Sequence, residues 1–325
     1  MTSPDSLPLR TLGNSDLRLT SIGFGAWAIG GGDWAFAWGS QDDNESIAAI
    51  HRAIDLGINW IDTAAIYGLG HSEEVVGRAL KSLSRKPYVF TKCGIRWKAD
   101  RTPFRTLKAA SLIEELDASL RRLGVETIDL YQIHWPDPDP EIEEAWETLA
   151  LFKKQGKVRW IGGSNFNVEQ MKRVREIAPI TSLQPPYSML RPGIEAEILP
   201  YVRDCGIGVI NYSPMVSGLL TGKMTAERVA AMPSDDWRRK AVEFNEPRLS
   251  RNLLLVDLLR EIGNAHNVSP GVVAVAWTQH NPGITAAIVG GRSASQVEEL
   301  SAVLHFKLRE EEYERINAFL ASNPV

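Results

Sequence analysis

Short apolar runs recur eight times along this 325-residue chain, separated by longer stretches with helical patterning. The runs span residues 19–27, 58–62, 88–92, 128–134, 158–165, 180–185, 208–213 and 285–290. They are continuously apolar or β-branched and do not alternate, which is typical of parallel strands that are covered on both faces. The pattern therefore predicts a strand followed by a helix, repeated eight times.

Capping and charge patterns predict where the helices begin and end. The stretch 72–83 opens with Ser72 as the expected N-cap and has acids in its first turn, which complement the helix dipole. The stretches 111–124 and 141–156 carry acids early, bases late and a glycine at the end. Further helices are expected over 44–57, 167–178, 194–206 (which contains Pro200), 253–266, 270–280 and 309–322.

This alternation belongs to the α/β class, whose two common solutions are an open doubly wound sheet and a closed (β/α)8 TIM barrel. Eight repeats favour the barrel. The opening residues predict an N-terminal β-hairpin that turns at Gly13–Asn14 and caps one end. A long polar insert between strands 7 and 8, residues 225–252, is expected to overhang the other end. Because no linker interrupts the sequence, residues 1–325 are expected to form a single domain.

The composition narrows the class of protein. Basic and acidic residues nearly balance, 36 against 40, so no charged surface for nucleic acid or membrane is expected. No apolar stretch reaches the roughly 20 residues of a membrane-spanning helix, and the N-terminus lacks the apolar run of a secretory signal. The two cysteines, Cys93 and Cys205, favour a reducing compartment, so a cytoplasmic protein is expected. Nothing in the sequence indicates the oligomeric state.

Four polar residues lie at or just beyond the carboxyl ends of three predicted strands: Asp62, Tyr67, Lys92 and His134. Function in a (β/α)8 barrel sits at this edge, so we expect the four side chains to form one site. A tyrosine hydroxyl is a poor acid near pH 7, because its ordinary pKa is about 10. An ammonium beside it, with a carboxylate behind, is expected to lower that pKa and make the phenol a proton donor. An imidazole that orients the protonated oxygen completes a site for carbonyl reduction.

The sequence does not support a Rossmann-type dinucleotide site, a P-loop, a metal site or a serine hydrolase. GFGAWA (23–28) imitates the G-x-G-x-x-A dinucleotide fingerprint, but the glycine-rich residues after it do not predict the helix that this motif requires. SGLLTGKM (217–224) lacks the glycine spacing of a P-loop, although its backbone amides could bind a pyrophosphate. The histidines show no metal-binding spacing, so no metal is expected, and the sequence has no G-x-S-x-G hydrolase motif.

Five tryptophans follow the first, third and fourth strands: Trp27, Trp34, Trp38, Trp97 and Trp135. They predict an aromatic-walled substrate pocket at the carboxyl end of the barrel. Such walls suit aryl or aliphatic aldehydes. The nearby Asp33, Arg96 and Lys98 would instead suit sugars or phosphorylated carbonyls, so the sequence leaves the substrate open.

With these residues assembled, the chain resembles the aldo-keto reductase superfamily over essentially its whole length. The matching segments include INWIDTAAIYGLGHSEEVVGRAL (58–80), IDLYQIHWPDP (128–138) and IVGGRSASQVEEL (288–300). The chain is most similar to the bacterial branch with DTAxxYGxGxSEE and VGxR signatures. The resemblance implies a (β/α)8 barrel and a catalytic tetrad of Asp62, Tyr67, Lys92 and His134, with Tyr67 as the general acid.

The resemblance also implies that NADP(H) lies across the carboxyl end, with Tyr212 stacked on the nicotinamide. Ser164, Asn165 and Gln184 would hydrogen-bond its carboxamide. Arg292 would favour NADP(H) over NAD(H), because a guanidinium matches a 2′-phosphate. Leu300 replaces an Asn of the family and would remove one contact to adenine. The expected cofactor contacts are Gly25, Ala26, Trp27, Asp62, Ser164, Asn165, Gln184, Tyr212, Ser213, Pro214, Met215, Ser217, Gly218, Leu219, Lys223, Gly290, Arg292, Gln296 and Glu299.

The sequence therefore predicts an NADP(H)-dependent oxidoreductase that reversibly reduces an aldehyde or ketone to an alcohol, with a small molecule as its partner. One alternative is an NADPH-binding regulatory or sensor subunit with weak chemistry, which the intact tetrad disfavours. Another is an aldolase-like or hydrolytic barrel, in which Lys92 would form a Schiff base with a carbonyl substrate.

Overall fold

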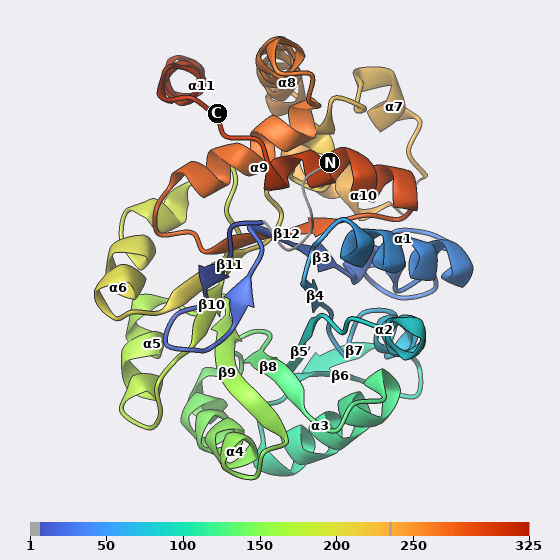
Figure 1. Ribbon diagram of the computed structural model, residues 1–325, viewed down its shortest axis with the longest axis vertical. Helices are drawn as coiled ribbons and strands as arrows, with labels where there is room; N and C mark the ends of the chain where they lie inside the picture. The colour runs from blue at the N-terminus through green and yellow to red at the C-terminus, as the bar shows by residue number, and fades with distance from the viewer. Residues whose placement is uncertain (1–6, 234–235, 325) are drawn as a thin grey trace.

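All eight predicted strands form, and they close into a barrel surrounded by helices (Figure 1). The computed structural model describes residues 7–233 and 236–324. Every neighbouring pair of barrel strands is parallel, which confirms the predicted (β/α)8 TIM barrel. The barrel strands are β3 (Ile22–Gly25), β4 (Trp60–Asp62), β5 (Tyr88–Cys93), β8 (Ile128–Ile133), β9 (Val158–Ser164), β10 (Ser182–Gln184), β11 (Gly208–Asn211) and β12 (Ala286–Gly290).

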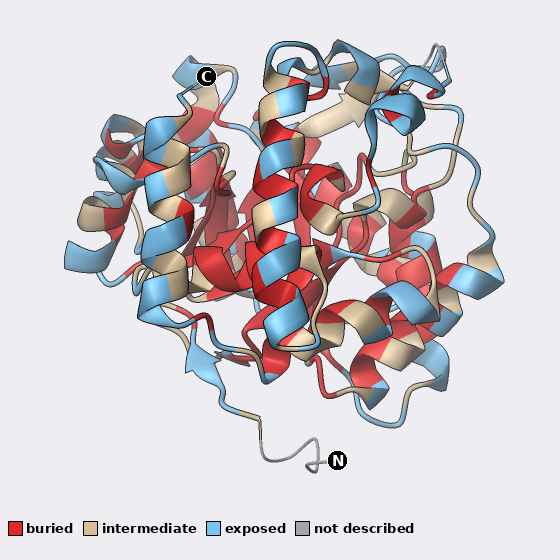
Figure 2. Ribbon diagram, turned by 90° about the horizontal axis from the view of Figure 1, so that it is seen from above, coloured by how far each residue is buried: buried red, intermediate tan, exposed pale blue. Residues whose placement is uncertain are grey.

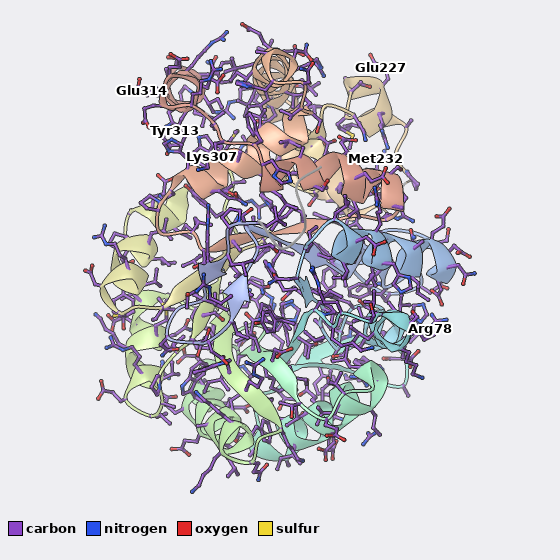
Figure 3. All side chains as sticks on the ribbon, viewed as in Figure 1. Arg78, Glu227, Met232, Lys307, Tyr313 and Glu314 are labelled. Atoms are coloured by element: carbon purple, nitrogen blue, oxygen red, sulfur yellow. The ribbon has the colours of Figure 1, made fainter. Side chains whose placement is uncertain are left out.

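Most of the helices bury one face and expose the other, as the burial colours in Figure 2 show, whereas α9 (Pro270–His280) is buried on nearly all sides. The helices are α1 (Asp43–Asp55), α2 (His71–Ser82), α3 (Ala109–Leu123), α4 (Ile142–Lys154), α5 (Val168–Arg175), α6 (Ile198–Asp204), α7 (Ala226–Ala230), α8 (Arg248–Ala265), α9 (Pro270–His280), α10 (Ala294–Ser301) and α11 (Glu310–Ser322). The last helix packs outside the barrel as predicted, and it carries Tyr313, which is labelled in Figure 3. The Tyr313 ring stacks on His280 of α9 with ring centroids 3.9 Å apart. None of the helices in the described part of the chain is long and apolar enough to cross a membrane.

Three predicted helix starts are wrong, and one of them is that of α8, which begins at Arg248 and not at residue 253. Helix α2 begins at His71 after Gly70, whose φ of 101° requires glycine, and Ser72 is not its N-cap. The Ser72 hydroxyl instead donates to Ala26 O at 2.8 Å and contacts Thr63 Oγ1 at 2.9 Å, so it ties α2 to the segments after β3 and β4. Helix α6 begins at Ile198 and not at residue 194, which leaves its proline in the first turn, where a missing N–H costs nothing.

The N-terminal hairpin closes the amino end of the barrel, as predicted. Its strands β1 (Arg10–Thr11) and β2 (Arg18–Leu19) are antiparallel. A Cβ on Gly13 would lie 2.2 Å from Thr181 O and 2.7 Å from Gly208 N, so only glycine allows this close approach to the barrel. Three hairpin leucines are fully buried in one cluster with residues from inside the barrel, namely Leu12, Leu17 and Leu19 against Trp60, Phe90, Leu130, Ile210 and Ala286.

The carboxyl end carries more structure than the sequence predicted. A second antiparallel hairpin follows β5, with strands β6 (Ile95–Trp97) and β7 (Pro103–Arg105). The insert between β11 and β12 contains α7 and the 3₁₀ turns η6 (Trp237–Lys240) and η7 (Val242–Phe244), while residues 234–235 lie outside the described residues. After β3 comes only the short 3₁₀ turn η2 (Trp27–Ile29), so the glycine motif at 23–28 does not open a dinucleotide-binding helix.

Candidate active site

The barrel brings the four predicted catalytic residues together at its carboxyl end. Asp62 is the last residue of β4, Lys92 lies one residue before the end of β5, and His134 follows β8 directly. Tyr67 lies in the turn between β4 and α2. The rings of Tyr67 and His134 meet edge to face with centroids 5.6 Å apart. Parallel strands in one barrel thus place side chains from three separate segments in contact.

Lys92 contacts both Asp62 and Tyr67 and so links the members of this group. Its Nζ donates to Asp62 Oδ1 at 2.5 Å, to Thr63 O at 2.9 Å and to Tyr67 Oη at 3.3 Å. An ammonium has three donors, so these contacts use all of them. The position of Nζ relative to the Tyr67 hydroxyl is therefore tightly fixed.

Asp62 is the counter-ion of Lys92, and both of its carboxylate oxygens accept hydrogen bonds. Its second oxygen, Oδ2, accepts from Gln184 Nε2 at 2.9 Å and from Gln132 Nε2 at 3.4 Å. Asp62 and Lys92 are 2% and 1% exposed. A buried ion pair is stable only when its remaining hydrogen-bonding capacity is met, as it is at this site.

The environment sets the protonation states. Burial opposes the charged form of Lys92, but Asp62 and Tyr67 outweigh it and raise the pKa of Lys92. Burial raises the pKa of Tyr67, and the ammonium offsets this only in part, so the predicted net lowering of this pKa is wrong. Burial, helped by Lys92 and Arg105, lowers the pKa of His134 well below 6.5. At neutral pH the phenol is protonated and the imidazole is neutral.

A further buried carboxylate supports β5 from the side that faces α3. Glu115 accepts from Gly94 N at 2.9 Å and from Ser111 Oγ at 3.2 Å. Gly94 comes two residues after Lys92, so this contact fixes the strand end that carries the ammonium. Burial raises the pKa of Glu115 to about 7, despite these hydrogen bonds.

A cavity of about 810 Å³ opens over the tetrad and extends to the loop after β12. It is lined by Tyr67 and His134 at one end and by Arg292 and Glu299 at the other. Of the predicted cofactor contacts, only Leu219 does not line the cavity; its side chain is fully buried in the core. The others that line it are Gly25, Ala26, Trp27, Asp62, Ser164, Asn165, Gln184, Tyr212, Ser213, Pro214, Met215, Ser217, Gly218, Lys223, Gly290 and Gln296.

Aromatic rings form the wall nearest the tetrad. Trp27 stacks on Tyr67 with centroids 6.1 Å apart, and it meets Trp38 edge to face at 5.3 Å. Trp34 and Trp135 also line the cavity, as predicted. Trp97 does not: it lies in β6, and the prediction that it lines the pocket is wrong.

Sequence reasoning missed several residues of this wall. Trp237 from the insert supports the wall by stacking on Trp27 at 5.9 Å, without itself lining the cavity. Arg238 does line the cavity and lies 5.1 Å over the Trp38 ring. Phe36, Phe104 and Arg105 also line the cavity. These residues lie in loops and in the unpredicted hairpin, where no periodic pattern marks them. The one feature of the sequence that could have indicated them is the DDWR motif of the insert, which contains Trp237 and Arg238.

A chain of hydrogen bonds links the tetrad to the middle of the cavity. Tyr212 Oη donates to Asn165 Oδ1 at 2.8 Å, and Asn165 Nδ2 donates to His134 O at 3.0 Å and to Ser164 Oγ at 2.9 Å. Burial raises the pKa of Tyr212 to about 12, so this donor stays protonated. Asn165 adopts a φ of 64°, an uncommon backbone conformation that these contacts hold in place.

The loop after β11 has an unusual backbone where it borders the cavity. Ser213, Val216 and Ser217 have φ values of 57°, 49° and 53°. Gly218 has a φ of 90°, and a Cβ built there would meet no heavy atom within 4 Å. Strained backbone of this kind concentrates at binding sites. Beyond the loop, Lys223 Nζ pairs with Glu299 at 2.6 Å across the cavity.

Comparisons with known proteins agree with this geometry. The family model for the Aldo/keto reductase family matches residues 21–321. Aldo-keto reductase YhdN of Bacillus subtilis (strain 168) is 39% identical over 321 residues, which cover 97% of this chain and 95% of the relative. NADH-specific methylglyoxal reductase of Escherichia coli (strain K12) is 35% identical over 311 residues, which cover 91% of this chain and 93% of the relative.

Solved structures agree as well. The glycerol dehydrogenase AKR11B4 from Gluconobacter oxydans matches with a TM-score of 0.89 and 38% identity, covering 98% of this chain and 97% of that chain. Enzymes of this family use nicotinamide cofactors and act on small-molecule carbonyl substrates. By its sequence, its barrel and its relatives, the chain belongs to the aldo/keto reductase family.

Proposed function

We propose that this protein is an NADP(H)-dependent oxidoreductase that reversibly reduces an aldehyde or ketone to the alcohol. The observation that carries the proposal is the position of the Tyr67 hydroxyl, 3.3 Å from the Lys92 ammonium and at the wall of a large aromatic cavity. A protonated phenol beside a fixed cation is suited to giving up its proton to a developing alkoxide.

The residues along the cavity fit a nicotinamide dinucleotide. Lys223 and Arg292 supply cations for phosphate groups, and the open backbone at Gly218 allows close approach of a pyrophosphate. Ser164, Asn165, Gln184 and Tyr212 would hold the nicotinamide end, although each already makes a hydrogen bond within the barrel or to its neighbours. A bound dinucleotide of this kind supplies the hydride for the carbonyl carbon, or accepts it in the reverse direction.

The tetrad residues divide the remaining work. Tyr67 donates its phenolic proton to the carbonyl oxygen, and Lys92 stabilises the tyrosinate that results. Asp62 keeps Lys92 charged and fixed in place. The neutral His134 donates a hydrogen bond to the same oxygen and so favours charge build-up there. In alcohol oxidation the same groups act in reverse, with the tyrosinate as general base.

The cavity narrows the proposed substrate to aryl or aliphatic aldehydes and ketones. Asp33, Arg96 and Lys98, which would have favoured sugars or phosphorylated carbonyls, do not line it. Arg96 instead pairs with Glu114 at 2.8 Å. The relatives named for methylglyoxal and glycerol suggest that small oxygenated substrates belong in the test panel.

One relative, 30% identical, is named a putative voltage-gated potassium channel subunit beta of Schizosaccharomyces pombe. The regulatory alternative is nevertheless not favoured, because the tetrad is complete and the three relatives described above are named as reductases and a dehydrogenase. The preference for NADP(H) rests on Arg292 alone, and one relative is named as NADH-specific.

The test of the proposed function is steady-state oxidation of NADPH and NADH with a panel of aldehydes. We expect turnover with aromatic and short aliphatic aldehydes and a higher kcat/KM with NADPH. Tight NADPH binding without turnover on any substrate would support the regulatory alternative. A Schiff base at Lys92 would be revealed by borohydride trapping without any nicotinamide.

A further inference from the structure

Arg292 is clasped by the loop between β3 and α1. Its Nε donates to Gln41 Oε1 at 2.6 Å, its Nη1 donates to Trp38 O at 3.2 Å, and its Nη2 donates to the Ser40 carbonyl. Gln41 Nε2 donates in return to Arg292 O at 2.9 Å. A single side chain, Gln41, thus holds both the guanidinium and the backbone of a residue 251 positions away.

The acceptors around Arg292 are all neutral, so its charge is not compensated by this clasp. Among residues 7–233 and 236–324, no carboxylate forms an ion pair with Arg292. Two other cations at the cavity differ: Lys223 pairs with Glu299 at 2.6 Å, and Arg238 pairs with Asp236 at 2.6 Å. Arg292 is therefore a cation with a fixed position and a free charge, which is the arrangement an anion-binding site requires.

We infer that Gln41 is a positioning residue for the recognition of a 2′-phosphate, because it holds the uncompensated guanidinium of Arg292 at the adenosine end of the cavity. This inference rests on the proposed function, which places the adenosine of NADP(H) there. It adds a residue that contacts Arg292 from the loop between β3 and α1, and this loop also supplies Trp38 to the aromatic wall.

The donor count of arginine makes the clasp compatible with a ligand. A guanidinium has five N–H donors, and the loop uses one on each of the three nitrogens. Two N–H donors are left for phosphate oxygens. A side chain that is already ordered loses less rotamer freedom on binding than a mobile one, so the clasp favours affinity. The neutral amide of Gln41 orients Arg292 without cancelling its charge.

Binding of 2′,5′-ADP and 5′-AMP to the full-length protein tests the inference, because the two probes differ only in the 2′-phosphate. Calorimetric titration gives both dissociation constants without any turnover. Gln41→Glu keeps an acceptor for Nε but adds a carboxylate, and Arg292→Met removes the charge. Gln41→Ala removes both contacts of the Gln41 side chain with Arg292 and leaves the two backbone acceptors in place. Gln155→Glu makes the same charge change at an exposed, distant helix end and is the control.

We expect 2′,5′-ADP to bind about tenfold more weakly to Arg292→Met and Gln41→Glu, and about threefold more weakly to Gln41→Ala. Affinity for 5′-AMP should stay within about twofold in every variant, which also shows that the site is folded. Gln155→Glu should match the wild type with both probes.

The outcomes separate this inference from the proposed function. If Arg292→Met weakens 2′,5′-ADP binding but neither Gln41 variant does, the role of Gln41 is overturned and the cofactor placement stands. Tighter 2′,5′-ADP binding by Gln41→Ala would also overturn it, because the loop would then compete with the phosphate for the guanidinium. No effect of Arg292→Met would contradict the proposed cofactor placement, and the inference with it.

Discussion

The two ends of the cavity are held together in different ways. At the catalytic end, Asp62 and Lys92 are almost fully buried, and they lie on neighbouring strands of the closed barrel. At the adenosine end, Lys223 and Glu299 pair with side chains that are 55% and 31% exposed. These two residues come from the segment between β11 and α7 and from α10, and not from strands.

This difference in burial implies that contacts at the catalytic end are costly to change and that contacts at the adenosine end are not. Breaking a buried, fully hydrogen-bonded ion pair costs several kcal/mol, whereas an exposed pair contributes about 0–1 kcal/mol. The reaction geometry is therefore a property of the barrel, while cofactor affinity and preference depend on loops. Four substitutions probe this contrast, in decreasing order of their expected effect on turnover.

Tyr67→Phe should have the largest effect, because it removes the proposed general acid and changes little else. We expect kcat to fall by about 10²–10⁴-fold, while the dissociation constant for NADPH changes little. Stopped-flow or steady-state kinetics with one good aldehyde, together with an NADPH titration, measures both quantities.

Tyr131→Phe is the matched control for that experiment. Its hydroxyl is also buried, and Tyr131 is not among the residues that line the cavity. The control should retain wild-type turnover. If Tyr67→Phe did the same, the proposed role of the phenol would have to be abandoned.

Lys92→Met should reduce turnover nearly as much, and it should also reduce stability. It leaves the Asp62 carboxylate buried without its counter-ion, which typically costs about 3–5 kcal/mol. The double variant Asp62→Asn, Lys92→Met removes both charges, so we expect its Tm to recover while kcat stays low. Thermal unfolding and kinetics on both proteins check this. Normal turnover in the double variant would show that the ammonium has no part in the reaction.

Lys223→Met should raise KM for NADPH and NADH by a similar factor, about three- to tenfold, and leave kcat nearly unchanged. The reason is that Lys223 is proposed to meet the pyrophosphate, which both cofactors share. The effect should shrink at high salt, because the lysine is exposed. A loss of kcat instead would mean that the two ends of the cavity are coupled more tightly than their contacts indicate.

The same contrast explains what the sequence could and could not predict. Each barrel strand lies in a largely apolar run, and the runs end at or beside Asp62, Lys92 and His134, so the strand pattern predicted that these three lie at one edge. Tyr67 lies five residues beyond its strand and was predicted from its chemistry and from the family resemblance. The contact between Gln41 and Arg292 joins two loops with no periodic pattern, and Trp237 comes from an irregular insert. The prediction of a lowered pKa for Tyr67 is wrong for a related reason. The order of residues along the chain does not show how deeply a side chain is buried, and burial is what raises this pKa.

The smallest expected effect on turnover is that of Glu115→Gln, whose consequence is a change in how stability depends on pH. Burial raises the pKa of Glu115 from 4.5 to about 7, so the folded protein holds this proton more tightly than the unfolded chain. Its contribution to stability is fully present below pH 4.5 and is lost as the pH rises toward 7. The loss amounts to at most about 3 kcal/mol, since one pKa unit corresponds to about 1.4 kcal/mol.

Glu115→Gln keeps an acceptor for Gly94 N but cannot ionise, so its stability should not decline over this range. We expect the difference in Tm between the wild type and the variant to change by several degrees between pH 5 and 8, with kcat at pH 7 close to that of the wild type. Glu114→Gln, next in sequence and mostly exposed, should show no such trend. Parallel pH profiles for wild type and Glu115→Gln would mean that the carboxylate behind β5 is already ionised at acidic pH. In that case burial of Glu115 would not make the stability of the catalytic end depend on pH.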